Sequence, residues 1–145
     1  MNELVLVFTI AGRRVALRTA DVYSVVEIDG VTPIPGAPGY VLGLSALRSI
    51  TITVVDAAAA IGVAPPAMPE RGARAAIVDH EGHRFALVVD DIDDVAELHS
   101  RPAPVPGEAG PGWQRVSEGL VETARGPALL LTLAAVLSGP DAIAA

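Results

Sequence analysis

Two segments decide the fold: residues 12–28, GRRVALRTADVYSVVEI, and residues 82–98, GHRFALVVDDIDDVAEL, which align at a shift of 70 residues. Seven aligned positions carry the same amino acid, and two more exchange one aliphatic side chain for another. The identical pairs are Gly12 and Gly82, Arg14 and Arg84, Ala16 and Ala86, Leu17 and Leu87, Asp21 and Asp91, Val25 and Val95, and Glu27 and Glu97. These matches indicate an internal duplication. The alternative is chance similarity in a chain rich in alanine and valine.

The repeat continues beyond these segments. A shift of 71 residues aligns Ile-Pro-Gly at residues 34–36 with Val-Pro-Gly at residues 105–107. A shift of 76 residues then aligns Val-Val-Asp at residues 54–56 with Leu-Leu-Thr at residues 130–132. The growing shift predicts that the second half carries a few extra loop residues.

Each half is predicted to form five short strands, because β-branched and aliphatic runs alternate with tight turns. We expect strands at residues 3–10, 14–18, 23–28, 42–47 and 50–55, and again at 73–79, 84–89, 95–98, 116–123 and 127–131. Proline-rich segments at residues 29–39 and 99–112 cannot sustain a hydrogen-bond ladder, so they are predicted to be loops.

Two short helices are also expected. The side chain of Asp56 can accept a hydrogen bond from the amides of the following turn, and Gly62 can end a helix over residues 56–61. Thr132 could cap a helix over residues 133–137 in the same way.

Five short strands per half suit a small barrel, whose closure removes exposed strand edges. We therefore expect an all-β fold in which residues 1–145 form one domain of two five-stranded barrels, with short helices. The first barrel would comprise residues 1–66 and the second residues 67–145, joined at the proline-rich residues 65–69. Because a barrel of about 65 residues is marginal alone, the two should pack tightly against each other.

The composition excludes several functions. All 10 basic residues are arginine, so chemistry that needs a lysine, such as Schiff-base formation, is excluded. A net charge of −7 with scattered arginines offers no basic stripe for nucleic acid. The longest apolar stretch, residues 128–137, is too short to span a bilayer. No signal peptide is readable and cysteine is absent, so we expect a cytoplasmic protein.

No cluster of side chains predicts catalysis, a cofactor or a metal. The turn at residues 79–83, Asp-His-Glu-Gly-His, lacks the spacing of a zinc site, although a small-ligand carrier or hydrolase built on it is an alternative. The acidic residues 90–94 lack the glycine and closing glutamate of a calcium loop. Arg48, a lone cation at a predicted turn between two apolar strands, is the side chain that we single out for partner contact.

Several of these segments resemble the CheW family of chemotaxis coupling proteins. They are residues 4–8 (LVLVF), 23–28 (YSVVEI), 41–49 (VLGLSALRS), 54–56 (VVD), 85–91 (FALVVDD) and 101–104 (RPAP). The resemblance covers nearly the whole chain, and it independently implies two SH3-like barrels of five strands each.

This resemblance implies a non-enzymatic adaptor that bridges the regulatory domain of a CheA-type histidine kinase and the cytoplasmic tip of a chemoreceptor. Arg48 stands at the arginine of the family's Asn-Leu-Arg-Gly signature, which is implicated in receptor contact. Val25, Glu27 and Gly43 match family positions whose alteration disturbs coupling. These four residues are therefore the expected protein-binding residues.

The chain departs from the family pattern around Arg48. Ala46 replaces the signature asparagine, Ser49 the glycine, and Thr53 a usual proline, while residues 57–58 are Ala-Ala instead of Leu-Arg. A turn with positive φ after Arg48 would cost serine more than glycine. Two variants of the function stay open: a diverged paralogue that binds only the kinase, and a structural component of the array that self-associates.

Overall fold

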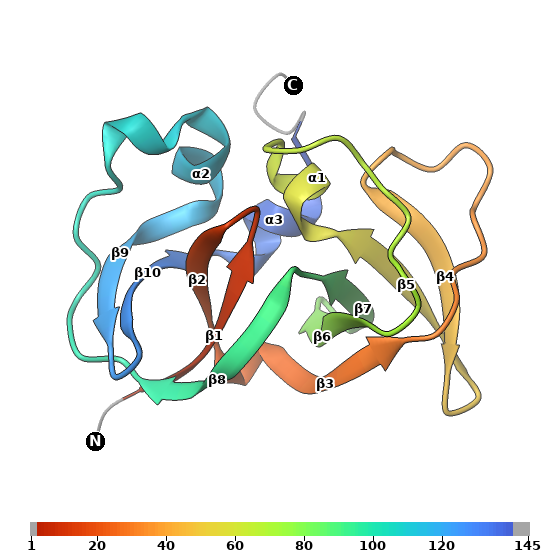
Figure 1. The fold of residues 1–145 in the computed structure, drawn as a ribbon, viewed down its shortest axis with the longest axis horizontal. Coiled ribbons are helices and arrows are strands. Elements are labelled where there is room, and N and C mark those ends of the chain that lie inside the picture. Colours follow the sequence, from red (N-terminus) through yellow and green to blue (C-terminus); the bar gives the residue numbers. More distant parts are fainter. Residues whose placement is uncertain (1–2, 141–145) are drawn as a thin grey trace.

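The computed structural model describes residues 3–140, which form ten strands in two five-stranded sheets (Figure 1). The first sheet has the strand order β8 (Asp91–Glu97), β1 (Leu4–Ile10), β2 (Arg13–Arg18), β10 (Gly126–Leu131), β9 (Ser117–Thr123). The second has the order β3 (Val22–Ile28), β6 (Ala73–His80), β7 (His83–Val88), β5 (Ile50–Asp56), β4 (Val41–Leu47). The prediction of an all-β fold with two five-stranded units is confirmed.

Three short α-helices contact one another at the upper side of the view in Figure 1: α1 (Ala57–Ile61), α2 (Pro111–Val116) and α3 (Leu133–Ser138). The predicted helix start at Asp56 is confirmed, since its Oδ1 accepts a hydrogen bond from the amide of Ala59 at 3.2 Å. Gly62 follows α1 in the left-handed conformation, at φ 93°. The capping role expected for Thr132 is wrong, because its side chain makes no cap hydrogen bond to α3.

Helix α2 lies where a loop was expected up to Gly112. Its proline stands in the first turn, where the missing N–H costs nothing, so proline here starts a helix instead of breaking one. Trp113 and Val116 are buried in the core. Arg115 donates hydrogen bonds to the carbonyl oxygens of Ala135, at 2.7 Å, and Ala60, at 2.8 Å, and burial lowers its pKa. Arg115 thereby ties α2 to α1 and α3.

Both sheets take strands from each of the expected halves, residues 1–66 and 67–145. The first sheet combines β1 and β2 with β8, β9 and β10, and the second combines β3, β4 and β5 with β6 and β7. The sheets therefore do not follow the expected boundary between residues 66 and 67. The physical reason is that β2 and β7 each take a parallel partner, β10 and β5, that is distant in sequence. Such pairing leaves no local turn signal.

The duplication is nevertheless visible in the strand register. Leu4 lies opposite Glu97 in the first sheet, and Arg74 lies opposite Glu27 in the second. Both pairs are related by the shift of 70. In the parallel pairs, Val15 lies opposite Leu129 and Phe85 opposite Thr53, so the shifts of 70 and 76 hold there too. The two sheets are thus equivalent structures, each built from the first two strands of one repeat and the last three of the other.

The largest apolar cluster joins the two sheets and the helices. It contains Phe8 and Leu17 from the first sheet, Val78 and Leu87 from the second, and Trp113 from α2. Each sheet also has a smaller inner cluster of its own. The expectation that the two units pack tightly is consistent with this shared core, which withdraws one face of β1, β2, β6 and β7 from water.

Glycine allows the proline-rich loops to cross the fourth strand of each repeat. Thr32 exchanges two backbone hydrogen bonds with Leu44, of 2.8 and 2.9 Å, and Ala103 exchanges two with Leu120, both 2.8 Å. A Cβ atom on Gly43 or Gly119 would overlap the carbonyl oxygen of Thr32 or Ala103. Gly43 also has a φ of 146°. Both loop positions therefore require glycine at this contact.

The hairpin between β4 and β5 turns through Arg48 and Ser49, as predicted. Their φ angles are 50° and 69°, and positive φ at both central residues is the requirement of a type I′ turn. The two other hairpins of this kind have glycine second, in Ala11-Gly12 and Glu81-Gly82. Ser49 is therefore held in a conformation that disfavours a side chain.

Replacing Gly43 by alanine should lower the free energy of unfolding by about 2–3 kcal/mol, because overpacking forces the crossing loop away. Gly119→Ala should have a similar but smaller effect, since no positive φ adds to the overlap. Urea denaturation followed by circular dichroism measures both. Gly30→Ala is the matched control, because a Cβ there meets nothing within 4 Å. A Gly43→Ala variant as stable as Gly30→Ala would contradict the role assigned to this contact.

Replacing Ser49 by glycine should stabilise the protein. The left-handed conformation costs a non-glycine residue roughly 1–2 kcal/mol, and glycine loses about 0.5–1 kcal/mol of that gain through its greater entropy when unfolded. We expect a net gain of about 0.5–1 kcal/mol, seen as a rise in thermal midpoint of about 2 °C. Gly82→Ser, at the second position of another such turn, should change stability in the opposite direction. A lower midpoint for Ser49→Gly would refute this account of the turn.

Candidate functional site

A small hollow opens at the end of the second sheet, where β3 approaches the turn between β4 and β5. It encloses about 80 Å³, well below the roughly 300–1,000 Å³ of typical small-molecule sites. Its lining is mostly apolar and comprises Tyr23, Ser24, Val26, Leu47, Arg48, Ile50, Ile52, Ile77 and Arg84. We call it the second-sheet pocket. Its size suits one side chain better than a cofactor.

Arg48 stands at the rim of this pocket. Its backbone is fixed by the tight turn, and its side chain is exposed. Within residues 3–140 Arg48 takes part in no ion pair or side-chain hydrogen bond. The cation that the sequence singled out is therefore presented to solvent beside an apolar hollow.

The opposite rim is formed by Tyr23 and Arg84. The guanidinium carbon of Arg84 lies 3.7 Å from the centre of the Tyr23 ring, a cation–π contact, and its Nε donates to Oδ1 of Asp79 at 3.0 Å. Tyr23 is 59% exposed, and Ile50 beside Arg48 is 57% exposed. Two large apolar side chains thus remain in water around an otherwise apolar pocket, as in surfaces that bind a partner.

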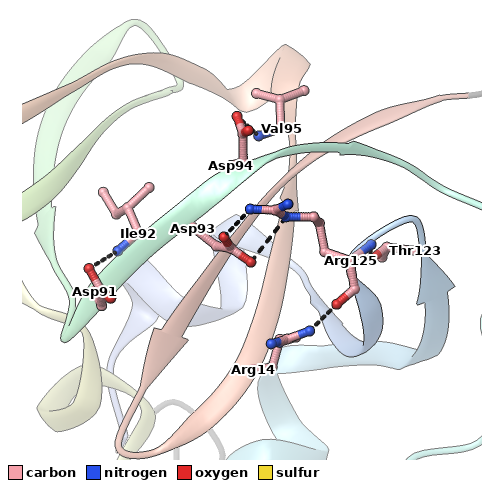
Figure 2. Close-up of polar contacts among 8 residues, drawn as sticks. All are labelled: Arg14, Asp91, Ile92, Asp93, Asp94, Val95, Thr123 and Arg125. Atoms are coloured by element: carbon pink, nitrogen blue, oxygen red, sulfur yellow. Dashed lines mark hydrogen bonds and ion pairs between the residues drawn. The ribbon is translucent and has the colours of Figure 1, made fainter.

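The equivalent place in the first sheet is closed (Figure 2). The repeat relates Tyr23 to Asp93, Arg84 to Arg14 and Ser49 to Arg125. There the guanidinium of Arg125 donates two hydrogen bonds to the carboxylate of Asp93, one of them from Nε at 3.3 Å, and lowers its pKa. Arg14 donates to the carbonyl oxygen of Arg125. We call this arrangement the first-sheet latch.

The other acidic residues of this segment bind their own backbone. Asp91 accepts a hydrogen bond from the amide of Ile92 at 2.9 Å, and Asp94 accepts one from the amide of Val95 at 2.7 Å (Figure 2). Asp79 of the histidine turn is occupied by Arg84, while His80 lies 3.8 Å from Glu81. Among residues 3–140, no three His, Asp or Glu side chains gather as a metal site would require.

The remaining expected binding residues lie outside the pocket. Val25 and Glu27 follow Tyr23 on the exposed side of β3, which is an edge strand, and Val25 is 39% exposed. Gly43 is buried beneath the crossing loop, so its evident role is in the fold. The structure thus brings only Arg48 of the four to the pocket. Binding by Val25, Glu27 and Gly43 stays a prediction.

Tyr23, Ile50 and Arg84 were not selected from the sequence. Tyr23 and Arg84 come from different repeats and meet only because the strands are exchanged between the sheets. One signal was nevertheless available: the aligned repeats place an aromatic residue, Tyr23, opposite an acidic one, Asp93, within a stretch of otherwise similar residues.

A larger depression of about 590 Å³ lies between Tyr40 and residues 64–66. Its lining is proline, glycine, alanine and valine apart from Tyr40, so it offers no converging charged groups to orient a small ligand. None of the helices formed by residues 3–140 has the length and apolarity needed to cross a membrane.

Comparison with known proteins adds independent findings. The family model described as "CheW-like domain" matches residues 4–141. The crystal structure of the scaffolding protein TtCheW from Thermoanaerobacter tengcongensis is similar at a TM-score of 0.76 and 24% sequence identity, covering 91% of this chain and 90% of that chain. No curated protein matches this sequence. Because the family model extends from the first strand to beyond α3, the chain belongs to the CheW-like domain family.

Proposed function

We propose that this protein is an adaptor that couples chemoreceptors to a CheA-type histidine kinase. Membership of the CheW-like family supports a scaffold role in chemotaxis. The finer proposal is that one surface binds the regulatory domain of the kinase and another the cytoplasmic tip of a receptor. Such an adaptor acts in the cytoplasm and without catalysis.

The second-sheet pocket is the observation that carries this proposal. A guanidinium with no partner within residues 3–140, Arg48, stands beside exposed Tyr23 and Ile50 at the edge of a water-accessible hollow. Arginine and tyrosine are enriched among the residues that dominate binding energy at protein interfaces. The pocket is too small for a typical cofactor. Binding a protein side chain is therefore the use that its geometry favours.

Isothermal titration calorimetry of this protein against the kinase regulatory domain and a receptor-tip hairpin from the same organism tests the proposal. We expect each to bind with a dissociation constant of roughly tens of micromolar or tighter, which corresponds to at least about 6 kcal/mol. Binding of the kinase alone would reduce the function to that of a kinase-binding paralogue. Binding of neither partner would overturn the proposal, and self-association without them would indicate a structural module.

Replacing Arg48 by aspartate should weaken receptor binding by about tenfold or more, because reversing an interface cation costs at least about 1.4 kcal/mol. Arg101→Asp is the matched control: Arg101 is also exposed, and the charge change is the same. Both variants should keep the circular dichroism spectrum of the parent. Equal receptor affinities for the two variants would remove Arg48 from the interface, and so would an Arg48→Asp variant that loses its fold.

A further inference from the structure

The two sheets contain the same site in two different states. In the first sheet the carboxylate of Asp93 is held by Arg125, and the nearby Arg14 further lowers the pKa of Asp93. In the second sheet Tyr23 takes the place of Asp93, so this repeat supplies no acidic side chain there. The arginine equivalent to Arg14, Arg84, is present and stacks on the tyrosine.

The second-sheet pocket therefore has cations and an apolar floor but lacks the carboxylate of its counterpart. Arg84 is partly neutralised by Asp79, at 3.0 Å, whereas Arg48 has no such partner within residues 3–140. Val26, Ile52 and Ile77 line the floor. An unpaired guanidinium over apolar side chains is complementary to an acidic group with apolar neighbours.

We infer that the second-sheet pocket accepts an aspartate or glutamate side chain, flanked by apolar residues, from a partner protein. The carboxylate lies between Arg48 and the Tyr23–Arg84 pair and takes the place that Asp93 fills within the first sheet. This inference rests on the proposed adaptor function and names the chemistry of its partner.

The physical chemistry of the pocket favours this occupant. A guanidinium binds a carboxylate through two parallel hydrogen bonds, and the apolar floor strengthens them by excluding water. The volume of about 80 Å³ accommodates the end of one side chain. The net charge of −7 does not prevent the approach of an acidic segment, because salt screens charges more than about 8 Å apart at physiological ionic strength. Contacts at short range therefore decide the binding.

A carboxylate placed in the pocket by mutation should compete with that of the partner. Tyr23→Asp restores the acidic residue that the first sheet has, and Tyr23→Asn is the matched variant that removes the same ring without adding charge. Against whichever partner binds the parent protein, we expect Tyr23→Asp to bind at least about tenfold more weakly than Tyr23→Asn. Equal affinities of these two variants, both folded by circular dichroism, would overturn the inference.

A second measurement needs no kinase or receptor. The capped peptides acetyl-Leu-Asp-Leu-amide and acetyl-Leu-Asn-Leu-amide are titrated into ¹⁵N-labelled protein while the Nε–H signals of arginine are followed by NMR. The aspartate peptide should shift the signals of Arg48 and Arg84, with a dissociation constant on the order of millimolar. Arg48→Gln should abolish the shift of Arg84, while Arg101→Gln should leave it unchanged.

The two experiments separate the two proposals. Shifts caused by the aspartate peptide alone, in a protein that binds neither kinase nor receptor, would overturn the adaptor function and support the pocket chemistry. Equal shifts with the aspartate and asparagine peptides, in a protein that binds its partners, would overturn the pocket chemistry and leave the adaptor function standing.

Discussion

The apolar layer between the two sheets is the constraint on which the rest of the structure depends. The first two strands of each repeat pair with the last three strands of the other, so neither repeat can complete a sheet alone. Side chains such as Phe8, Leu17, Val78 and Leu87 bury one face of those first two strands in the shared cluster. The domain is therefore one cooperative unit, and the end of each sheet is assembled from residues about 70 positions apart.

The duplicated frame explains why one end of the molecule can be open and the other closed. Features that the frame needs occur in both repeats, such as Gly43 and Gly119 beneath the crossing loops. The ends of the sheets lie outside the shared core, so side chains there can differ without disturbing it. At these ends Asp93 and Arg125 form a latch, while Tyr23 and Arg48 border a pocket. Binding capacity thus arises where the second copy lacks an ion pair.

Much of the local structure could be predicted. Alternating aliphatic residues located the strands to within a few residues, apart from the early start of β8, and Asp56 and Gly62 marked the ends of α1. Helix α2 was missed because proline and glycine normally signal a loop, while burial of Trp113 stabilises a helix there. Arg48 was identified at its turn, but the pocket beside it was not, because Tyr23 and Arg84 become neighbours only in the folded chain.

The sequence by itself determined the duplication, the strands, the turn at Arg48 and the absence of lysine, because each follows from residue type and short spacing. Only the tertiary structure decided which strands share a sheet, since the parallel pairs of β2 with β10 and of β5 with β7 join distant segments. It also decided that one sheet end is closed and the other open. That difference depends on whether a guanidinium meets a carboxylate in space, which neither residue type nor sequence spacing specifies.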